Sequence, residues 1–177
     1  MARSRRQWGW HQLAADAAAA LVQEARLPPR ALVLDVGAGL GAVTGALLEA
    51  GHRVVAIEAH PGRALELRER YGERIKVVQA DAADLRLPRR PFHVVANPPF
   101  SITSALLRRL LHPGSRLVSA TLLVQDAAAR RWAGPHAPAA ARWQQLHQAR
   151  LGPPVPRRAF RPPPQVPTRI LHIHRRP

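Results

Sequence analysis

The feature that most constrains the fold is an alternation of short apolar runs with helix-like segments between Ala31 and Val124. The apolar runs have the length of buried strands, whereas the segments between them have the longer patterns typical of helices. Strands separated by helices form βαβ units, which build a parallel sheet covered by helices on both faces. The pattern therefore predicts an α/β fold, a doubly wound and mostly parallel seven-stranded sheet with Rossmann-like architecture.

Individual elements can be placed from the same pattern. The expected strands are 31–36, 52–58, 75–80, 92–96, 116–124 and 168–174, and the expected helices are 12–25, 42–50, 62–71, 103–111 and 126–133. The stretch 134–152 is ambiguous by period. Seven prolines between Pro153 and Pro167 exclude a helix or a central strand there, because proline has no N–H to donate. We expect a basic arm and helix in 1–30 and a catalytic domain in 31–177, which together form a single domain.

The charge of the chain indicates its kind of partner. Its Lys and Arg residues number 27, of which only Lys76 is a lysine, against 11 acids, and the formal net charge is +16. Such an excess favours nucleic acid as the partner, with an anionic membrane surface as the weaker alternative. The absence of cysteine excludes disulfides, a thiol nucleophile and a zinc–thiolate site. No segment resembles a membrane span or signal peptide, so we expect a cytoplasmic monomer that binds no membrane.

The motif Asn97-Pro98-Pro99-Phe100 follows the apolar run 92–96. An amide, two stiff prolines and an aromatic ring at the end of a strand suit the binding of a flat, extruded base. The amide oxygen of Asn97 and the carbonyl of Pro98 are two acceptors for an exocyclic amino group. Phe100 offers a face for stacking. The alternative is a simple proline turn that closes the strand.

A glycine loop and two acids occupy the ends of other strands. Asp35-Val36-Gly37-Ala38-Gly39 follows the first strand, Glu58 ends the second and Asp81 ends the third. Glycines allow a tight turn and close approach of a ligand, and the acids are suited to bind a ribose and an adenine amino group. The loop also fits a dinucleotide fingerprint. The carboxylate of Asp35, however, would repel a pyrophosphate, whereas it is compatible with the cationic end of S-adenosylmethionine. All these residues are expected at the carboxyl edge of the sheet.

The motifs together resemble those of the ribosomal RNA adenine N6-methyltransferase family, which includes erythromycin-resistance methylases and small-subunit dimethyladenosine transferases. The likeness covers nearly the whole chain and is most specific in 158–166 (Arg-Ala-Phe-Arg-Pro-Pro-Pro-Gln-Val), similar to a segment that precedes the family's last strand. The resemblance implies a class I S-adenosylmethionine-dependent methyltransferase fold, with S-adenosylmethionine as cofactor and ribosomal RNA as partner. The form of the Asn97 motif is similar to that of actinomycete resistance methylases.

The resemblance also implies roles for individual residues. The catalytic residues would be Asn97, Pro98 and Phe100, and the cofactor-binding residues would be His11, Leu13, Gly37, Gly39, Glu58, Asp81, Ala82 and Asn97. His11 stands where the family has an asparagine. The family's small C-terminal helical domain has no counterpart in these 177 residues, so either the arginines act as the RNA clamp, which we expect, or RNA binding is weakened. No metal is expected, although His172 and His174 share one face of a strand.

The expected function is N6-methylation of an adenine in ribosomal RNA, most simply 23S rRNA, with macrolide-class resistance as the consequence. Small-subunit rRNA dimethylation is the first alternative, and DNA adenine or protein glutamine methylation would use a similar motif. A non-catalytic RNA-binding assembly factor on the same fold is the alternative from another class. Trp8 and Trp10 are expected to anchor the basic arm against the core.

Overall fold

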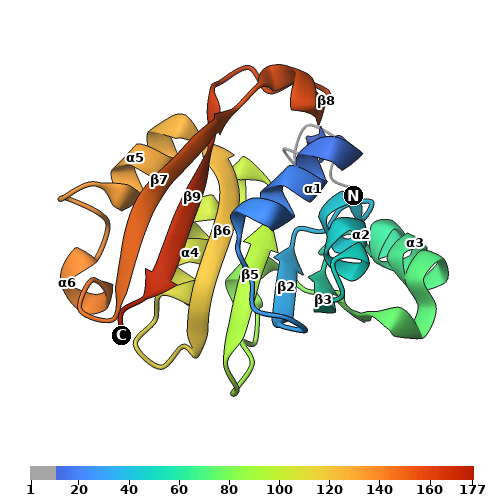
Figure 1. Ribbon diagram of the computed structural model, residues 1–177, viewed down its shortest axis with the longest axis horizontal. Coiled ribbons are helices and arrows are strands. Elements are labelled where there is room, and N and C mark those ends of the chain that lie inside the picture. The colour runs from blue at the N-terminus through green and yellow to red at the C-terminus, as the bar shows by residue number, and fades with distance from the viewer. Residues whose placement is uncertain (1–10) are drawn as a thin grey trace.

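The computed structural model describes residues 11–177, and its sheet is the predicted doubly wound type (Figure 1). The helices and strands follow in the order β1 Gln12–Leu13, α1 Ala15–Glu24, β2 Leu32–Val36, α2 Ala42–Glu49, β3 Arg53–Ile57, α3 Pro61–Tyr71, η2 Gly72–Arg74, β4 Lys76–Val78, η3 Ala82–Asp84, β5 Phe92–Ala96, η4 Phe100–Ile102, α4 Thr103–Leu110, β6 Leu117–Gln125, α5 Asp126–Ala133, α6 Ala140–Trp143, β7 His147–Val155, η5 Arg157–Ala159, β8 Phe160–Arg161 and β9 Thr168–Arg175. Most predicted elements are confirmed, with ends that differ by one or two residues. The basic arm and its two tryptophans, Trp8 and Trp10, lie outside the described residues.

The main sheet has seven strands in the order β4-β3-β2-β5-β6-β9-β7. The first five run parallel, whereas β9 lies antiparallel between β6 and β7. From β2 the chain adds β3 and then β4 on one side, and it then crosses back to place β5 on the other side of β2. A reversal of this kind opens a crevice at the carboxyl ends of the two strands, where such folds bind ligands. Asp35 is in β2 and Asn97 directly follows β5, so both residues belong to this crevice.

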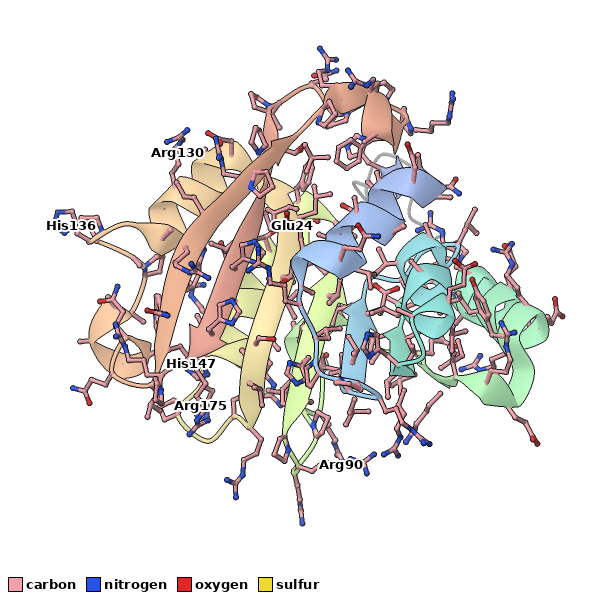
Figure 2. All side chains as sticks on the ribbon, in the orientation of Figure 1. Glu24, Arg90, Arg130, His136, His147 and Arg175 are labelled. Carbon is pink, nitrogen blue, oxygen red and sulfur yellow. The ribbon has the colours of Figure 1, made fainter. Side chains whose placement is uncertain are left out.

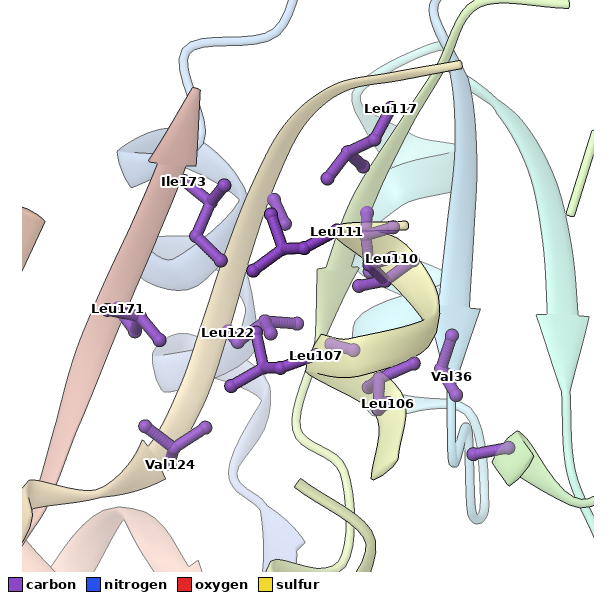
Figure 3. Close-up of a cluster of buried hydrophobic side chains, with 14 of the residues drawn as sticks. Val36, Leu106, Leu107, Leu110, Leu111, Leu117, Leu122, Val124, Leu171 and Ile173 are labelled. Atoms are coloured by element: carbon purple, nitrogen blue, oxygen red, sulfur yellow. The ribbon is translucent and has the colours of Figure 1, made fainter. Parts of the chain in front are cut away.

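The sheet separates two hydrophobic clusters, because alternate residues of each strand point to opposite faces. In β5, Val94 packs in the cluster with α4, α5 and α6, whereas its neighbour Val95 packs in the cluster with α1, α2 and α3. Figure 3 shows the first cluster, in which leucines of α4 lie beside the apolar face of β6 and β9 adds Leu171 and Ile173. Burial on both faces explains why the sequence of these strands reads as continuous apolar runs.

The first helix begins later than predicted. We expected a helix from Gln12, but Gln12 and Leu13 pair with β8 as the short strand β1, and the helix starts at Ala15. The backbone N–H of Ala14 donates to the carbonyl of Ala159 over 2.8 Å, so these residues are committed to a non-helical partner. Helix α1 then packs on α2 and β6 and shares its hydrophobic cluster with β2.

The proline-rich segment has the edge location that its composition required. The ambiguous stretch forms α6 and β7, and β7 is an edge strand whose register shifts between Leu151 and Pro154. Prolines are compatible with this position because one side of an edge strand needs no hydrogen-bond donors. Among residues 11–177, no helix is both long enough and apolar enough to cross a bilayer.

Candidate active site

The structure brings the predicted polar residues together at the carboxyl edge of the parallel strands. One cavity is lined by residues that include Gly37, Glu58, Asp81, Ala82 and Pro99. An adjoining cavity is lined by residues that include His11, Leu13, Asp35, Gly37 and Asn97. Gly37 belongs to both linings, so the glycine loop lies between the two cavities. The two cavities, of about 20 and 80 Å³, therefore adjoin at the glycine loop.

Gly37 is required by the contact between the glycine loop and the Asn97 motif. Its φ of +76° favours glycine, and a Cβ atom built on it would lie 2.7 Å from the Cδ atom of Pro99. The N–H groups of Gly37 and Ala38 both donate to the carbonyl of Ile57, at 2.8 and 3.0 Å. The loop is therefore fixed between β3 on one side and the Pro98-Pro99 backbone on the other.

Asp35 is a buried carboxyl at the base of the crevice. It is 1% exposed, and the hydroxyl of Thr44 donates to its Oδ2 atom over 2.7 Å. Desolvation by burial raises the pKa of Asp35 to about 7, against the opposing effect of the Thr44 hydrogen bonds. The charge of this carboxyl is consequently sensitive to pH near neutrality and to any cation placed beside it.

Glu58 is a buried acid that organises the loops on both sides of it. Its Oε2 atom accepts a hydrogen bond from the N–H of Gly39, and its Oε1 atom accepts one from the N–H of His60, both over 2.8 Å. Each carboxylate oxygen has a second lone pair, so these bonds leave acceptor capacity for a ligand. Gly39 itself has a φ of +58°, which places its N–H toward the acid.

Asp81 has a structural role as well as an exposed position. It precedes η3, and its Oδ1 atom accepts a hydrogen bond from the N–H of Ala83 over 2.9 Å, which caps that short helix. Its neighbour Ala82 is buried and forms part of the cavity wall. The capping bond occupies one oxygen of Asp81, and the carboxylate as a whole remains exposed at the cavity.

The Asn97 side chain is oriented by the backbone of His11. Its Nδ2 group donates to the carbonyl of His11 over 2.8 Å, which leaves the Oδ1 atom as the acceptor. The ring of His11 lies 5.4 Å from that of Phe100 and 6.4 Å from that of Phe160, and its Nδ1 atom donates to the carbonyl of Pro162 over 2.7 Å. Within residues 11–177, no group donates a hydrogen bond to the carbonyl of Pro98. The motif therefore presents two acceptors beside an aromatic pair.

Several cavity residues were missed by sequence reasoning. Ala59, Arg63, Ser101 and Ile102 also line the cavity of Glu58 and Asp81. Ala59 directly follows Glu58, and Ser101 and Ile102 are the two residues after Phe100; this proximity is the signal that the sequence offers. Arg63 is the third residue of α3, within its first turn, and has no sequence signal of its own.

The histidines of β9 do not form a metal centre with other residues. The rings of His172 and His174 lie 6.1 Å apart, which confirms that they share a face. His172 contacts the Thr121 hydroxyl at 3.3 Å and lies 3.6 Å from the Glu24 carboxylate. Across the described part of the chain, no three His, Cys, Asp or Glu side chains come together as metal ligands would.

The fold is that of class I S-adenosylmethionine-dependent methyltransferases, and its sheet carries a glycine loop, two acids and an Asn-Pro-Pro-Phe motif after neighbouring strands. The crystal structure of the 23S rRNA methyltransferase ErmE has the same fold, with a TM-score of 0.78 at 30% identity over 98% of this chain and 69% of that chain. The chain belongs to the ribosomal RNA adenine dimethylase family, whose model matches residues 3–177. The family and fold predicted from the sequence are thereby confirmed.

Two curated relatives indicate the range of the family. The mycinamicin-resistance protein MyrB of Micromonospora griseorubida is 40% identical over 81% of this chain and 47% of its own length. The ribosomal RNA small subunit methyltransferase A of Synechococcus sp. (strain JA-3-3Ab) is 35% identical over 98% of this chain and 68% of its own length. The chain thus spans about half to two thirds of the length of these relatives.

Proposed function

We propose that this protein transfers a methyl group from S-adenosylmethionine to N6 of an adenine in 23S rRNA and thereby confers macrolide-class resistance. The observation that carries this proposal is the orientation of Asn97, whose Nδ2 group is engaged by His11 so that its Oδ1 atom is an acceptor. An exocyclic amino group has two N–H bonds, and Asn97 Oδ1 and the Pro98 carbonyl are two acceptors at one place. Resemblance to ErmE and MyrB supports 23S rRNA and resistance.

The residues present fit S-adenosylmethionine. Glu58 has free acceptor capacity for ribose hydroxyls, and Asp81 offers an oxygen to an adenine amino group. His11, Leu13 and Asp35 line the adjoining cavity, where Asp35 favours a cationic group. Bound there, the cofactor supplies a methyl group already activated by a positively charged sulfur, so the protein needs no covalent intermediate.

The protein residues then act by positioning and electrostatics. Adenine N6 is a poor nucleophile because its lone pair is delocalised into the ring. Hydrogen bonds from N6 to Asn97 and Pro98 favour a pyramidal nitrogen and direct its lone pair toward the methyl group. Phe100 stacks on the extruded base, which repays part of the few kcal/mol that unstacking costs. His11 is a positioning residue, because it acts by holding the Asn97 amide.

The small-subunit activity is the second candidate. It is supported by the alignment with the Synechococcus methyltransferase, which extends over 98% of this chain. Mass spectrometry of 16S and 23S rRNA fragments, after expression in a host that lacks both modifications, distinguishes the two. We expect methylated adenine in 23S rRNA with the wild-type protein and none with Asn97→Ala. Methylation confined to 16S rRNA would favour the second candidate.

A non-catalytic assembly factor makes a different prediction. Such a protein would bind RNA but would have no need for the buried Glu58 and Asp35 beside a glycine loop. Calorimetric titration with S-adenosylmethionine and with NAD separates these cases. Tighter binding of NAD, or binding of neither compound, would contradict the proposed function.

A further inference from the structure

A further cavity, which we call the α4 cavity, lies at the far end of α4 from the Asn97 motif. It has a volume of about 580 Å³, within the range of small-molecule sites, and lies between the end of α4 and the connection from α5 to α6. Its lining includes Leu111, Pro113, Trp132, Pro138 and Trp143. Since α4 follows directly from Phe100–Ile102 and ends at Leu110, the whole helix separates this cavity from the catalytic motif.

The walls of this cavity are apolar and stiff. The rings of Trp132 and Trp143 lie 6.2 Å apart, and both side chains are almost fully buried beneath the cavity. The indole N–H of Trp143 donates to the carbonyl of Pro138 over 2.9 Å, so it does not need a hydrogen-bond acceptor from a ligand. Two prolines complete the walls. A flat apolar group can enter here without leaving a buried polar atom unpaired.

The rim and the neighbouring loops carry only positive charge. Arg108 and Arg142 belong to the lining, and both are exposed. Next to them, Arg176 donates to the carbonyl of Gln144 over 2.8 Å and Arg175 donates to that of Ser115 over 3.3 Å. Together with the exposed residues Arg89, Arg90 and Arg116 these form what we call the basic edge (Arg89, Arg90, Arg116, Arg142, Arg175 and Arg176). Figure 2 shows Arg90 and Arg175 at the same end of the sheet.

No carboxylate neutralises this surface within the described chain. The segments 86–91, 111–116, 142–147 and 175–177 contain no Asp or Glu. The arginine ion pairs of residues 11–177 both use Asp126, which lies at the opposite end of the sheet, after β6. Unpaired arginines beside an apolar slot complement a ligand that has a flat apolar part and negative charge on either side of it.

We propose that this cavity binds an unpaired nucleotide of the RNA substrate, with the base in the cavity and the flanking phosphates on Arg108, Arg142 and the basic edge. The inference rests on the proposed function, because it assigns a second contact to the same RNA. The concave shape favours an inserted base over a membrane surface, which is bound by protruding apolar groups. Unpaired bases are also the usual targets of specific RNA recognition.

Binding of a short oligouridylate tests the proposal, because this RNA has no adenine for the catalytic site. We expect wild-type protein to bind it at least about fivefold more tightly than an oligomer of the same length that lacks bases. Arg108→Gln/Arg142→Gln should reduce the slope of log affinity against log salt by about 1.4, which corresponds to two phosphate contacts. Ala139→Trp, which fills the cavity, should remove the preference for bases and leave the salt slope unchanged.

Arg68→Gln/Arg74→Gln is the matched control, because it removes the same charge from exposed positions outside the basic edge and the cavity. An equal loss of salt slope in both double variants would overturn the proposal, as would equal binding of the two oligomers. The proposal would also be overturned if Ala139→Trp and Arg108→Gln/Arg142→Gln lost binding to phosphatidylserine vesicles but bound RNA as wild type does. Titration with S-adenosylmethionine on the same preparations reports folding and keeps this test separate from that of the proposed function.

Discussion

Polar side chains at the two ends of the parallel strands differ in how they are held. At the carboxyl ends, the key groups are bound by the fold itself: Asp35 by Thr44, Glu58 by two backbone N–H groups, and Asn97 by the carbonyl of His11. At the opposite end, the basic edge extends into solvent, and Arg175 and Arg176 each donate one side-chain hydrogen bond to a backbone carbonyl.

The groups at the carboxyl ends are therefore oriented before a ligand binds, whereas the arginines of the basic edge can move to meet one. A group that is already oriented costs little to align when the transition state forms, so its removal should affect the rate. An exposed arginine remains free to follow a phosphate, so its removal should affect affinity and the response to salt. Variants at the two ends should therefore change different measured quantities.

The largest effect is expected for Asn97→Ala. Loss of one preorganised polar contact should lower the single-turnover rate of rRNA methylation by about 10²–10³, because the contact strengthens as N6 becomes pyramidal. RNA affinity should change little, since arginines elsewhere provide it. Ser104→Ala is the control, an exposed hydroxyl on α4 that lies outside the motif. A rate close to wild type for Asn97→Ala would mean that the motif is only a proline turn.

Glu58→Ala should have the next largest effect, on cofactor binding. It removes the ribose acceptor and also the carboxylate that accepts hydrogen bonds from the N–H groups of Gly39 and His60. We expect the affinity for S-adenosylmethionine to fall by about 1–3 kcal/mol, measured by calorimetry. Glu66→Ala, on the exposed face of α3, should bind as wild type does. Unchanged binding by Glu58→Ala would place the ribose elsewhere.

Sequence reasoning succeeded where a residue type has one local explanation. Gly37 and Glu58 directly follow β2 and β3, and Asp81 follows the end of β4 by three residues; strand ends can be read from hydrophobic runs. The start of α1 could not be predicted, because the partner that holds Ala14 is Ala159, 145 residues later in the chain. The orientation of Asn97 and the lining of the α4 cavity also depend on distant segments.

Asp35 should give a moderate and pH-dependent effect on stability. Its folded pKa of about 7 lies above the ordinary value of 3.8, so the folded protein holds this proton more tightly than the unfolded chain does. Stability should therefore decrease as the pH rises from about 4 to 7, by at most about 1.4 kcal/mol per pH unit. Above that range the carboxylate is ionised in both states and the loss is complete.

Asp35→Asn should remove this component. Thermal unfolding at pH 5 and pH 8 should show a smaller decrease of Tm for the variant than for wild type, by several degrees, at about 2–4 °C per kcal/mol. Histidines whose pKa burial lowers, such as His93 and His172, titrate in both proteins and cancel in the comparison. Parallel curves for the two proteins would contradict the buried, pH-sensitive carboxyl.

The smallest effects should come from exposed arginines. One pair of variants from each end of the parallel strands allows the two ends to be compared directly. Arg157→Gln/Arg158→Gln removes two charges from η5, next to the β8 residues that pair with β1 beside His11. Arg89→Gln/Arg90→Gln removes two from the basic edge. For a long rRNA fragment that reaches both ends, each pair should reduce the salt slope by about 1.4 and affinity only severalfold.

A short hairpin that carries only the target loop should separate the pairs. The salt slope of its binding should be smaller for Arg157→Gln/Arg158→Gln than for wild type. It should be unchanged for Arg89→Gln/Arg90→Gln, because the hairpin is too short to reach both ends of the sheet. Single-turnover rates at saturating RNA should stay near wild type in both variants, since neither pair touches the reacting atoms. If both pairs leave the salt slope of the long fragment unchanged, the net charge of +16 reflects composition and the arginines are not an RNA clamp.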